Sequence, residues 1–250
     1  MTLGYFVTWM MVFLRTVGVI TQLPIVAGRP IPVMVRIGLC ICIATLIAGM
    51  VGSADVPVTL WALCAAAMGE VLVGLALGFV GQMAFAAVEM AGRIISTEVG
   101  LSASPGFGVP EPAHEPLAAL ITTFAVVLFF LFGGHLTMIA ALTRSFTIIA
   151  PGHPGLSPAA AESFIRATSH LIELGMRMAA PFIAMNFLVT LAFASLGRVV
   201  PKMNPFIISF SMKLIAGFTL LGSAGALIAR YLYTEFDETP VRMLQLLTGR

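Results

Sequence analysis

Long stretches without a charged residue constrain the fold of this chain more than any other feature. One runs from Pro116 to Thr143, and another from Met178 to Gly197. A helix needs roughly 20 apolar residues to cross a hydrocarbon core of about 30 Å. Only 10% of all residues are charged, against about 25% in a soluble domain, and 59% are hydrophobic. The sequence therefore predicts an integral membrane protein, or a protein that is assembled through a membrane.

The apolar stretches predict an all-α fold, a hydrophobic membrane-type protein of about six long helices arranged as helical hairpins. The expected helices cover, approximately, residues 3–26, 37–53, 58–98, 116–143, 178–197 and 206–231. Residues 116–143 would form a single helix of roughly 42 Å, which is longer than a bilayer requires. No polar linker separates two cores, so we expect residues 1–250 to form one unit.

A loop rich in glycine and proline separates the third expected helix from the fourth. Its sequence is GLSASPGFGVPEPAHEP, from Gly100 to Pro116. Neither a helix nor a strand tolerates that density of helix breakers. Irregular backbone between apolar segments must be buried in protein or face a water-filled cavity, because bare peptide groups are costly in hydrocarbon. We therefore expect this loop to carry function.

Small and polar residues share one face of the third expected helix. At 100° per residue, seven of them fall within an arc of about 100°, namely Glu70, Gly74, Gly78, Gly81, Phe85, Glu89 and Gly92. Small residues let helix backbones approach closely. The face either packs within the chain or forms an interface with another subunit. The two carboxylates favour a partner subunit or a polar lumen, because a carboxylate that faces lipid is costly.

Five charged residues interrupt apolar stretches, namely Arg15, Glu70, Glu89, Arg93 and Lys213. Such residues are either structural ion pairs or functional groups. Arg15 and Lys213 lie centrally in their helices, and we predict that carboxylates or carbonyl groups at helix breaks hold them as buried charges. The basic residues near helix ends divide five against six between the two sides, so they do not orient the helices.

The sequence predicts no catalytic, metal or cofactor site. His114-Glu115 lacks the second histidine of a zincin motif, and His135 has no metal-ligating residue three or four positions away. Cys40, Cys42 and Cys64 lie in apolar runs and form neither a disulfide framework nor paired metal ligands. The net charge is +2 and there is no basic cluster, which argues against a nucleic-acid partner.

Four segments carry a family resemblance that covers nearly the whole chain. They are FLRTVGVITQLPIVAGRPIPVMVRIGL (Phe13–Leu39), VGLALGFVGQMAFAAVEMAGRIISTEVGLSAS (Val73–Ser104), FLFGGHL (Phe130–Leu136) and PKMNPFIISFSMKL (Pro201–Leu214). In the last segment, the matching motif residues are Pro201, Met203, Asn204, Phe206, Phe210 and Lys213. In this order the segments resemble the FliR/SctT family of type III secretion export-apparatus proteins. Lys202, Ser209 and Ser211 depart from the usual Gln, Gly and Pro of that family.

The resemblance implies a core component of the flagellar type III protein export gate. Members of the family form this gate with FliP- and FliQ-like partners, and unfolded flagellar subunits pass through its pore. Further partners that it implies are an FlhB-type gate protein, the basal-body ring and the exported proteins. The implied location is the bacterial inner membrane and the flagellum basal body. The gate is displaced out of the membrane plane, which would account for the undecided charge count.

In the family, the segment that matches Gly100–Pro116 projects into the pore and plugs it. The implied plug residues are Pro105, Gly106, Phe107, Gly108, Val109, Pro110, Glu111 and Pro112. We expect Phe107 to be the apolar tip, flanked by two glycines, while the prolines stiffen the loop. An apolar side chain in a narrow pore discourages water and ions. The alternative is an ordinary connector between helices, exposed on the outside.

Three other functions remain as alternatives. The first is an SctT-like homologue from a virulence type III secretion system, although residues 73–91 resemble the flagellar branch more closely. The second is a secondary transporter, which also uses broken helices and buried charges, but no internal repeat links the two halves of this chain. The third is a membrane-embedded hydrolase, for which the sequence provides no pair of nucleophile and base.

Overall fold

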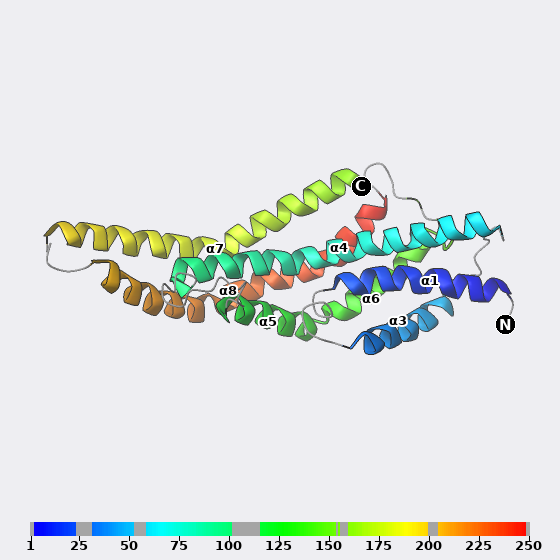
Figure 1. Ribbon diagram of the computed structural model, residues 1–250, viewed down its shortest axis with the longest axis horizontal. Coiled ribbons are helices and arrows are strands. Elements are labelled where there is room, and N and C mark those ends of the chain that lie inside the picture. The colour runs from blue at the N-terminus through cyan, green and yellow to red at the C-terminus, as the bar shows by residue number, and fades with distance from the viewer. Residues whose placement is uncertain are drawn as a thin grey trace. The chain divides into compact units, whose positions relative to one another are not determined.

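The computed structural model describes residues 3–23, 32–52, 59–101, 116–153, 155, 160–199 and 205–248 (Figure 1). Within these residues the chain forms helices and no strand, which confirms the predicted all-α fold. The helices are α1 (Leu3–Gln22), α3 (Val33–Ala48), α4 (Leu60–Val99), α5 (Pro116–Leu131), α6 (Gly134–Ile148), α7 (Ala160–Val199) and α8 (Pro205–Thr248).

Four of the described helices, α1, α4, α7 and α8, are long and apolar enough to cross a membrane. The broken pair α5 and α6 adds a fifth if it is counted as one span. With 40 residues each, α4 and α7 are about 60 Å long. Each is therefore about twice as long as one crossing of a ~30 Å hydrocarbon core requires.

The expected single helix over residues 116–143 is wrong, because the structure breaks it into α5 and α6. Gly133 has a φ of 72°, a left-handed conformation that residues with a Cβ rarely adopt. Its N–H donates to the carbonyl of Phe130 at 3.1 Å and ends α5, and the N–H of Leu136 donates to the Gly133 carbonyl at 2.9 Å and begins α6. Hydropathy does not register this break, since the residues on both sides are apolar.

Two of the expected helices are parts of longer ones. Residues 178–197 belong to α7, which begins at Ala160 and includes a polar first half. Ion pairs one turn apart, Glu162 with Arg166 and Glu173 with Arg177, satisfy the charges of this half while it stays helical. Residues 206–231 belong to α8, which continues through the polar tail to Thr248.

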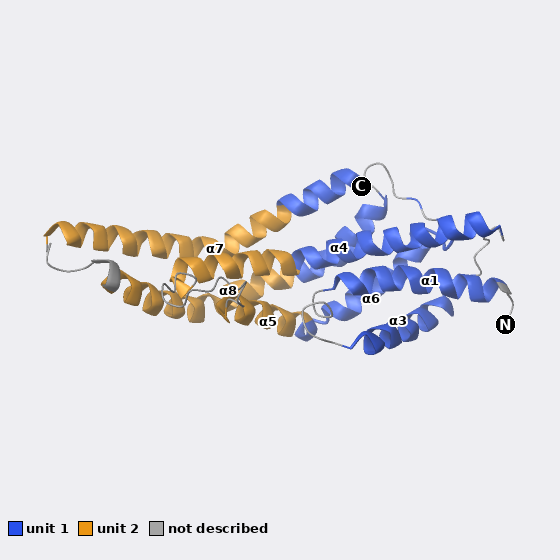
Figure 2. Cartoon of the chain, in the orientation of Figure 1, with its two compact units in different colours: residues 1–84, 130–169, 235–250 blue, residues 85–129, 170–234 orange. Residues whose placement is uncertain are grey.

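The chain divides into two compact units, each built from several chain segments (Figure 2). Unit 1 comprises residues 1–84, 130–169 and 235–250, and unit 2 comprises residues 85–129 and 170–234. Met11, Val12 and Leu77 are fully buried in unit 1, and Val88 and Phe182 are fully buried in unit 2, so each unit has a core of its own. The expectation that residues 1–250 act as one functional unit stays a prediction.

The long helices differ in how much of their surface the chain itself covers. Each of these helices contains an apolar stretch of 18 residues that could cross a membrane. In α4, 67% of this stretch is buried within the chain, whereas the share is 11% in α7 and 17% in α8. Exposed apolar side chains such as Ile165, Phe187 and Phe218 follow from this difference. The outer faces of α7 and α8 therefore need an apolar environment, either lipid or another protein.

Candidate functional site

Arg15, at the middle of α1, is fully buried in unit 1 and bonds to two other parts of that unit. Its Nε donates to Oε2 of Glu70 on α4 at 2.6 Å, and both side chains are 0% exposed. Nη1 donates to Oγ of Ser145 on α6 at 3.1 Å, and Nη2 donates to the carbonyl of Ile149 at 3.2 Å. The carboxylate and the carbonyl at the end of α6 are the two kinds of partner that the sequence predicts for this charge.

The remaining polar groups around Arg15 also have partners. The second oxygen of Glu70 accepts the N–H of Gly152 at 2.9 Å, and Gly152 has a φ of 85° that suits glycine. Ser145 Oγ donates in turn to the carbonyl of Leu142 at 2.7 Å. The ring of Phe146 lies 4.1 Å from Cζ of Arg15 and adds a cation–π contact. The polar groups of this cluster bond to one another, which suits a structural role that holds α1, α4 and α6 together.

The glycine face of α4 packs against other helices of the same chain. A Cβ at Gly74 would overlap the carbonyl oxygen of Arg15 on α1, and one at Gly78 would lie 2.9 Å from the carbonyl oxygen of Val19. A Cβ at Gly81 would lie 2.9 Å from Cε of Met138 on α6. Backbones that approach this closely leave no room for side chains.

The unit 2 part of the same face is filled in the same way. A Cβ at Gly92 would lie 3.0 Å from Cα of Ala118 on α5, and the ring of Phe85 packs edge-on against Phe129 at 5.3 Å between centroids. Packing within the chain, the first of the two alternatives, thus accounts for the glycines and Phe85. Glu89 alone among the seven predicted interface residues is exposed, at 53%, and it pairs with Arg93 one turn away.

A second polar cluster lies in unit 2, at the C-terminal end of α4. Asn186 on α7 donates from Nδ2 to the carboxylate of Glu98, and Thr190 Oγ1 donates to Oδ1 of Asn186 at 3.4 Å. Asn186 is the single amide side chain in the uncharged run from Met178 to Gly197. Unlike Arg15, these side chains are partly exposed.

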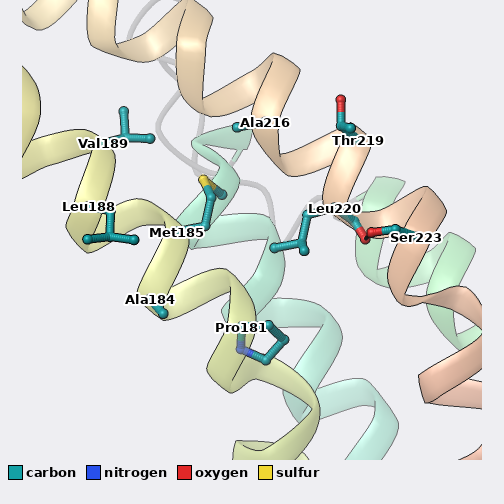
Figure 3. Close-up of a pocket in the computed structure, with 9 residues that line it drawn as sticks. All are labelled: Pro181, Ala184, Met185, Leu188, Val189, Ala216, Thr219, Leu220 and Ser223. Carbon is teal, nitrogen blue, oxygen red and sulfur yellow. Dashed lines mark hydrogen bonds between the residues drawn. The ribbon is translucent and has the colours of Figure 1, made fainter.

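An apolar groove of about 750 Å³ lies between α7 and α8 in unit 2 (Figure 3). Its lining residues are Pro181, Ala184, Met185, Leu188 and Val189 from α7, with Ala216, Thr219, Leu220 and Ser223 from α8. The two hydroxyl groups already donate to carbonyls of their own helix, Thr219 to Ile215 and Ser223 to Leu220. The groove therefore suits an apolar occupant and makes a poor site for a polar ligand.

Lys213 lies three residues before Ala216 of the groove, on the same face of α8. It is half-buried, and the described part of the chain gives it no ion-pair partner. The sequence predicts both Lys213 and Arg15 as buried charges, but within the described residues only Arg15 has an ion-pair partner. Phe210, another predicted motif residue, is 37% exposed and lies against Gly100.

Several predicted site residues fall outside the part of the chain that the structure describes. They are the whole predicted plug, Pro105 to Pro112, and the motif residues Pro201, Met203 and Asn204. Phe206 belongs to α8, but its side chain is not described. Among the residues that are described, no group of three or more His, Cys, Asp or Glu side chains is placed to hold a metal ion.

Sequence reasoning missed the residues that complete the two polar clusters. Ser145, Phe146, Ile149 and Gly152 join the Arg15 network, and Glu98, Asn186 and Thr190 form the second cluster. A usable signal existed only for Asn186, because an amide in a long uncharged helix needs a polar partner. Nothing in the local sequence indicates that the N–H of Gly152 donates a hydrogen bond to Glu70.

Nearly the whole chain is similar to one family of known proteins. The model of a family described as bacterial export proteins, family 1, matches residues 6–239. The flagellar biosynthetic protein FliR of Escherichia coli K12 is 33% identical over 226 residues, which cover 90% of this chain and 87% of that protein. FliR of Bacillus subtilis is 27% identical over 86% of this chain and 85% of its own length. The Yop proteins translocation protein T of Yersinia pestis is 27% identical over 58% of this chain and 56% of its own length.

Proposed function

The chain belongs to the family of bacterial export proteins, family 1, and on that basis we propose that it is a core component of a flagellar type III protein export gate. The observation that carries the proposal is the family match over residues 6–239, together with 33% identity to the FliR of Escherichia coli over 90% of this chain. The flagellar system is favoured over a virulence system because the Yop relative matches only 58% of the chain.

In this proposal the chain forms the export pore with FliP- and FliQ-like proteins in the inner membrane, at the flagellum basal body. Two properties of unit 2 support a hydrophobic partner. The apolar stretches of α7 and α8 that could cross a membrane are only 11% and 17% buried. An apolar groove also runs between these helices. An apolar helix from another subunit would cover both surfaces, as at obligate interfaces.

Deletion of the gene in its own host tests the proposal. We expect cells without flagella that no longer export flagellar subunits, and a tagged copy of the chain should restore both and recover two small hydrophobic partner proteins. Flagellated cells after the deletion would overturn the flagellar assignment. A loss of secreted virulence proteins instead would favour the SctT-like alternative. Uptake of a small solute by the purified chain in liposomes would favour a secondary transporter.

We also propose that Pro105–Pro112 closes the pore, with Phe107 as its apolar tip. This part rests on the sequence and on the family resemblance of the surrounding segments. Deleting residues 104–109 should give a leaky, salt-sensitive strain whose gate still assembles, measured as a reduced membrane potential and poor growth in high salt. Tight membranes with an assembled gate would show that the loop closes nothing.

A further inference from the structure

A directional polar contact holds the last turn of α4 to α7 within unit 2. Asn186 Nδ2 donates to the Glu98 carboxylate, and Thr190 Oγ1 donates to Oδ1 of the same amide at 3.4 Å. The ionised carboxylate of Glu98 can only accept, so the NH₂ group of Asn186 faces Glu98 and the amide oxygen accepts from Thr190. Three polar side chains thus form a short chain of hydrogen bonds between two apolar helices, where an unpaired polar group is costly.

The carboxylate of Glu98 differs from the other described carboxylates of α4 and α7. Glu70 pairs with Arg15, and Glu89, Glu162 and Glu173 each pair with an arginine one turn away on the same helix. Glu98 instead bonds to an amide from another helix. A hydrogen bond from a neutral amide depends more on orientation than the attraction of two charges does. The contact therefore fixes where the end of α4 lies against α7.

The same end of α4 is held on a second side by α8. Val99 is 1% exposed and packs so closely on Gly217 that a Cβ there would lie 2.5 Å from Val99 Cγ2. Gly100, with a φ of 93°, faces the ring of Phe210, whose Cε2 would lie 3.1 Å from an added Cβ. The N–H of Gly100 donates to the carbonyl of Thr97 at 3.1 Å and closes the helix.

We propose that Glu98 and Asn186 are positioning residues that tether the C-terminal turn of α4 to α7. Together with the contacts to α8, the tether fixes the position of the last described residues at this end of α4, Thr97 to Leu101. The consequence for ion leakage rests on the proposed export-gate function, whereas the tether itself is independent of it. Loss of the tether loosens the helix end, and in the gate it raises ion leakage without dissolving the complex.

Amide hydrogen exchange of the full-length chain in detergent micelles measures the tether directly. Asn186→Asp places two carboxylates against each other, and Asn186→Leu removes the donor without adding charge. Both should speed exchange in the peptide that contains Thr97 to Leu101, by about tenfold for Asn186→Asp, given the typical strength of a hydrogen bond to a charged group. Glu98→Gln keeps an acceptor oxygen but loses the charge, so it should speed exchange less than either Asn186 variant.

The double variant Glu98→Gln with Asn186→Asp is the decisive one. The amide introduced at position 98 can donate to the carboxylate introduced at position 186, so exchange should return close to the parent rate. A general disturbance of packing would not be repaired in this way. Glu89→Gln, on an exposed part of the same helix, is the matched control. Parent-like exchange in both Asn186 variants, or no rescue in the double variant, would overturn the tether.

The role of the tether in the gate is measured in cells, as membrane potential in high salt. Asn186→Asp should leak less than the strain that lacks residues 104–109, and the double variant should be tight. Faster exchange without leakage, in a background where the loop deletion leaks, would overturn this role. If the loop deletion itself does not leak, the proposed closure by the loop fails, and the exchange result still decides the tether.

Discussion

The two polar clusters of α4 differ in how completely the chain satisfies them. Around Arg15 and Glu70, in unit 1, two fully buried charges bond to each other, to a hydroxyl, to a carbonyl and to a backbone N–H. In unit 2, Glu98 and Asn186 are partly exposed, and the helices beside them leave an apolar groove uncovered. All the partners of the first cluster come from the chain itself. The second cluster lies beside apolar surfaces that lipid or another protein must cover.

This difference concerns how easily each cluster could change its partners. A closed network of buried charges resists any change, because removing one member strands another in a medium of low polarity. Partly exposed polar contacts and open apolar surfaces can change partners at much lower cost. We therefore infer that the Arg15 cluster is a rigid support within unit 1, and we propose the apolar groove of unit 2 as a surface that meets another subunit.

The largest effect should come from breaking the unit 1 cluster. Arg15→Met leaves Glu70 charged and buried without its partner, and we expect a loss of about 3–5 kcal/mol in the free energy of unfolding. Thermal unfolding of the detergent-solubilised chain measures it. The matched control is Arg93→Met, which breaks an exposed pair worth about 0–1 kcal/mol. Equal melting temperatures for the two variants would contradict the structural role of the buried Arg15–Glu70 pair.

A smaller effect should follow from separating α1 and α4. A Cβ at Gly74 overlaps the Arg15 carbonyl oxygen, so Gly74→Ala should force the helices apart and cost about 1–3 kcal/mol. At Gly222 on α8 a Cβ meets nothing within 4 Å, so Gly222→Ala should stabilise its helix by up to about 1 kcal/mol. Both variants are compared by the same unfolding measurement. Opposite signs are expected, and a neutral Gly74→Ala would contradict the close packing.

Filling the groove should leave stability alone and reduce partner binding. Ala184 is exposed and lines the groove, and Ala184→Trp would occupy the space that we assign to a partner helix. Ala194 is exposed on the same helix and is not a groove residue, which makes Ala194→Trp the control. Recovery of the hydrophobic partners in a pull-down should fall several-fold for the first variant alone. Full recovery with Ala184→Trp would place the interface elsewhere.

A change at Lys213 should have the smallest effect, visible only in the assembled gate. Lys213→Met should hardly alter the unfolding of the chain, since the described residues give this lysine no ion-pair partner. If a carboxylate or carbonyl of another subunit holds it, the same variant should reduce gate assembly, measured by co-purification. Parent-like assembly and export would show that the side chain reaches water by itself.

The features that the sequence predicted well are local ones. Apolar runs bounded by glycine, proline and charge predicted an all-α membrane-type chain, and the third helix was expected at residues 58–98 and lies at 60–99. These properties depend on the hydropathy and backbone preferences of consecutive residues. The break at Gly133 escaped notice because the residues on both sides of it are apolar, and a left-handed glycine carries no hydropathy signal.

Other features depend on which helices meet. The sequence placed a charge at Arg15, but the choice of Glu70 as its partner, 55 residues away, follows from the packing of α1 against α4. The pattern of small residues on α4 suits an interface within the chain and one between chains equally well. Only the tertiary structure decided that α1, α5 and α6 fill this face. A helical pattern specifies which residues share a face, whereas the partner of that face is determined by contacts between segments far apart in the chain.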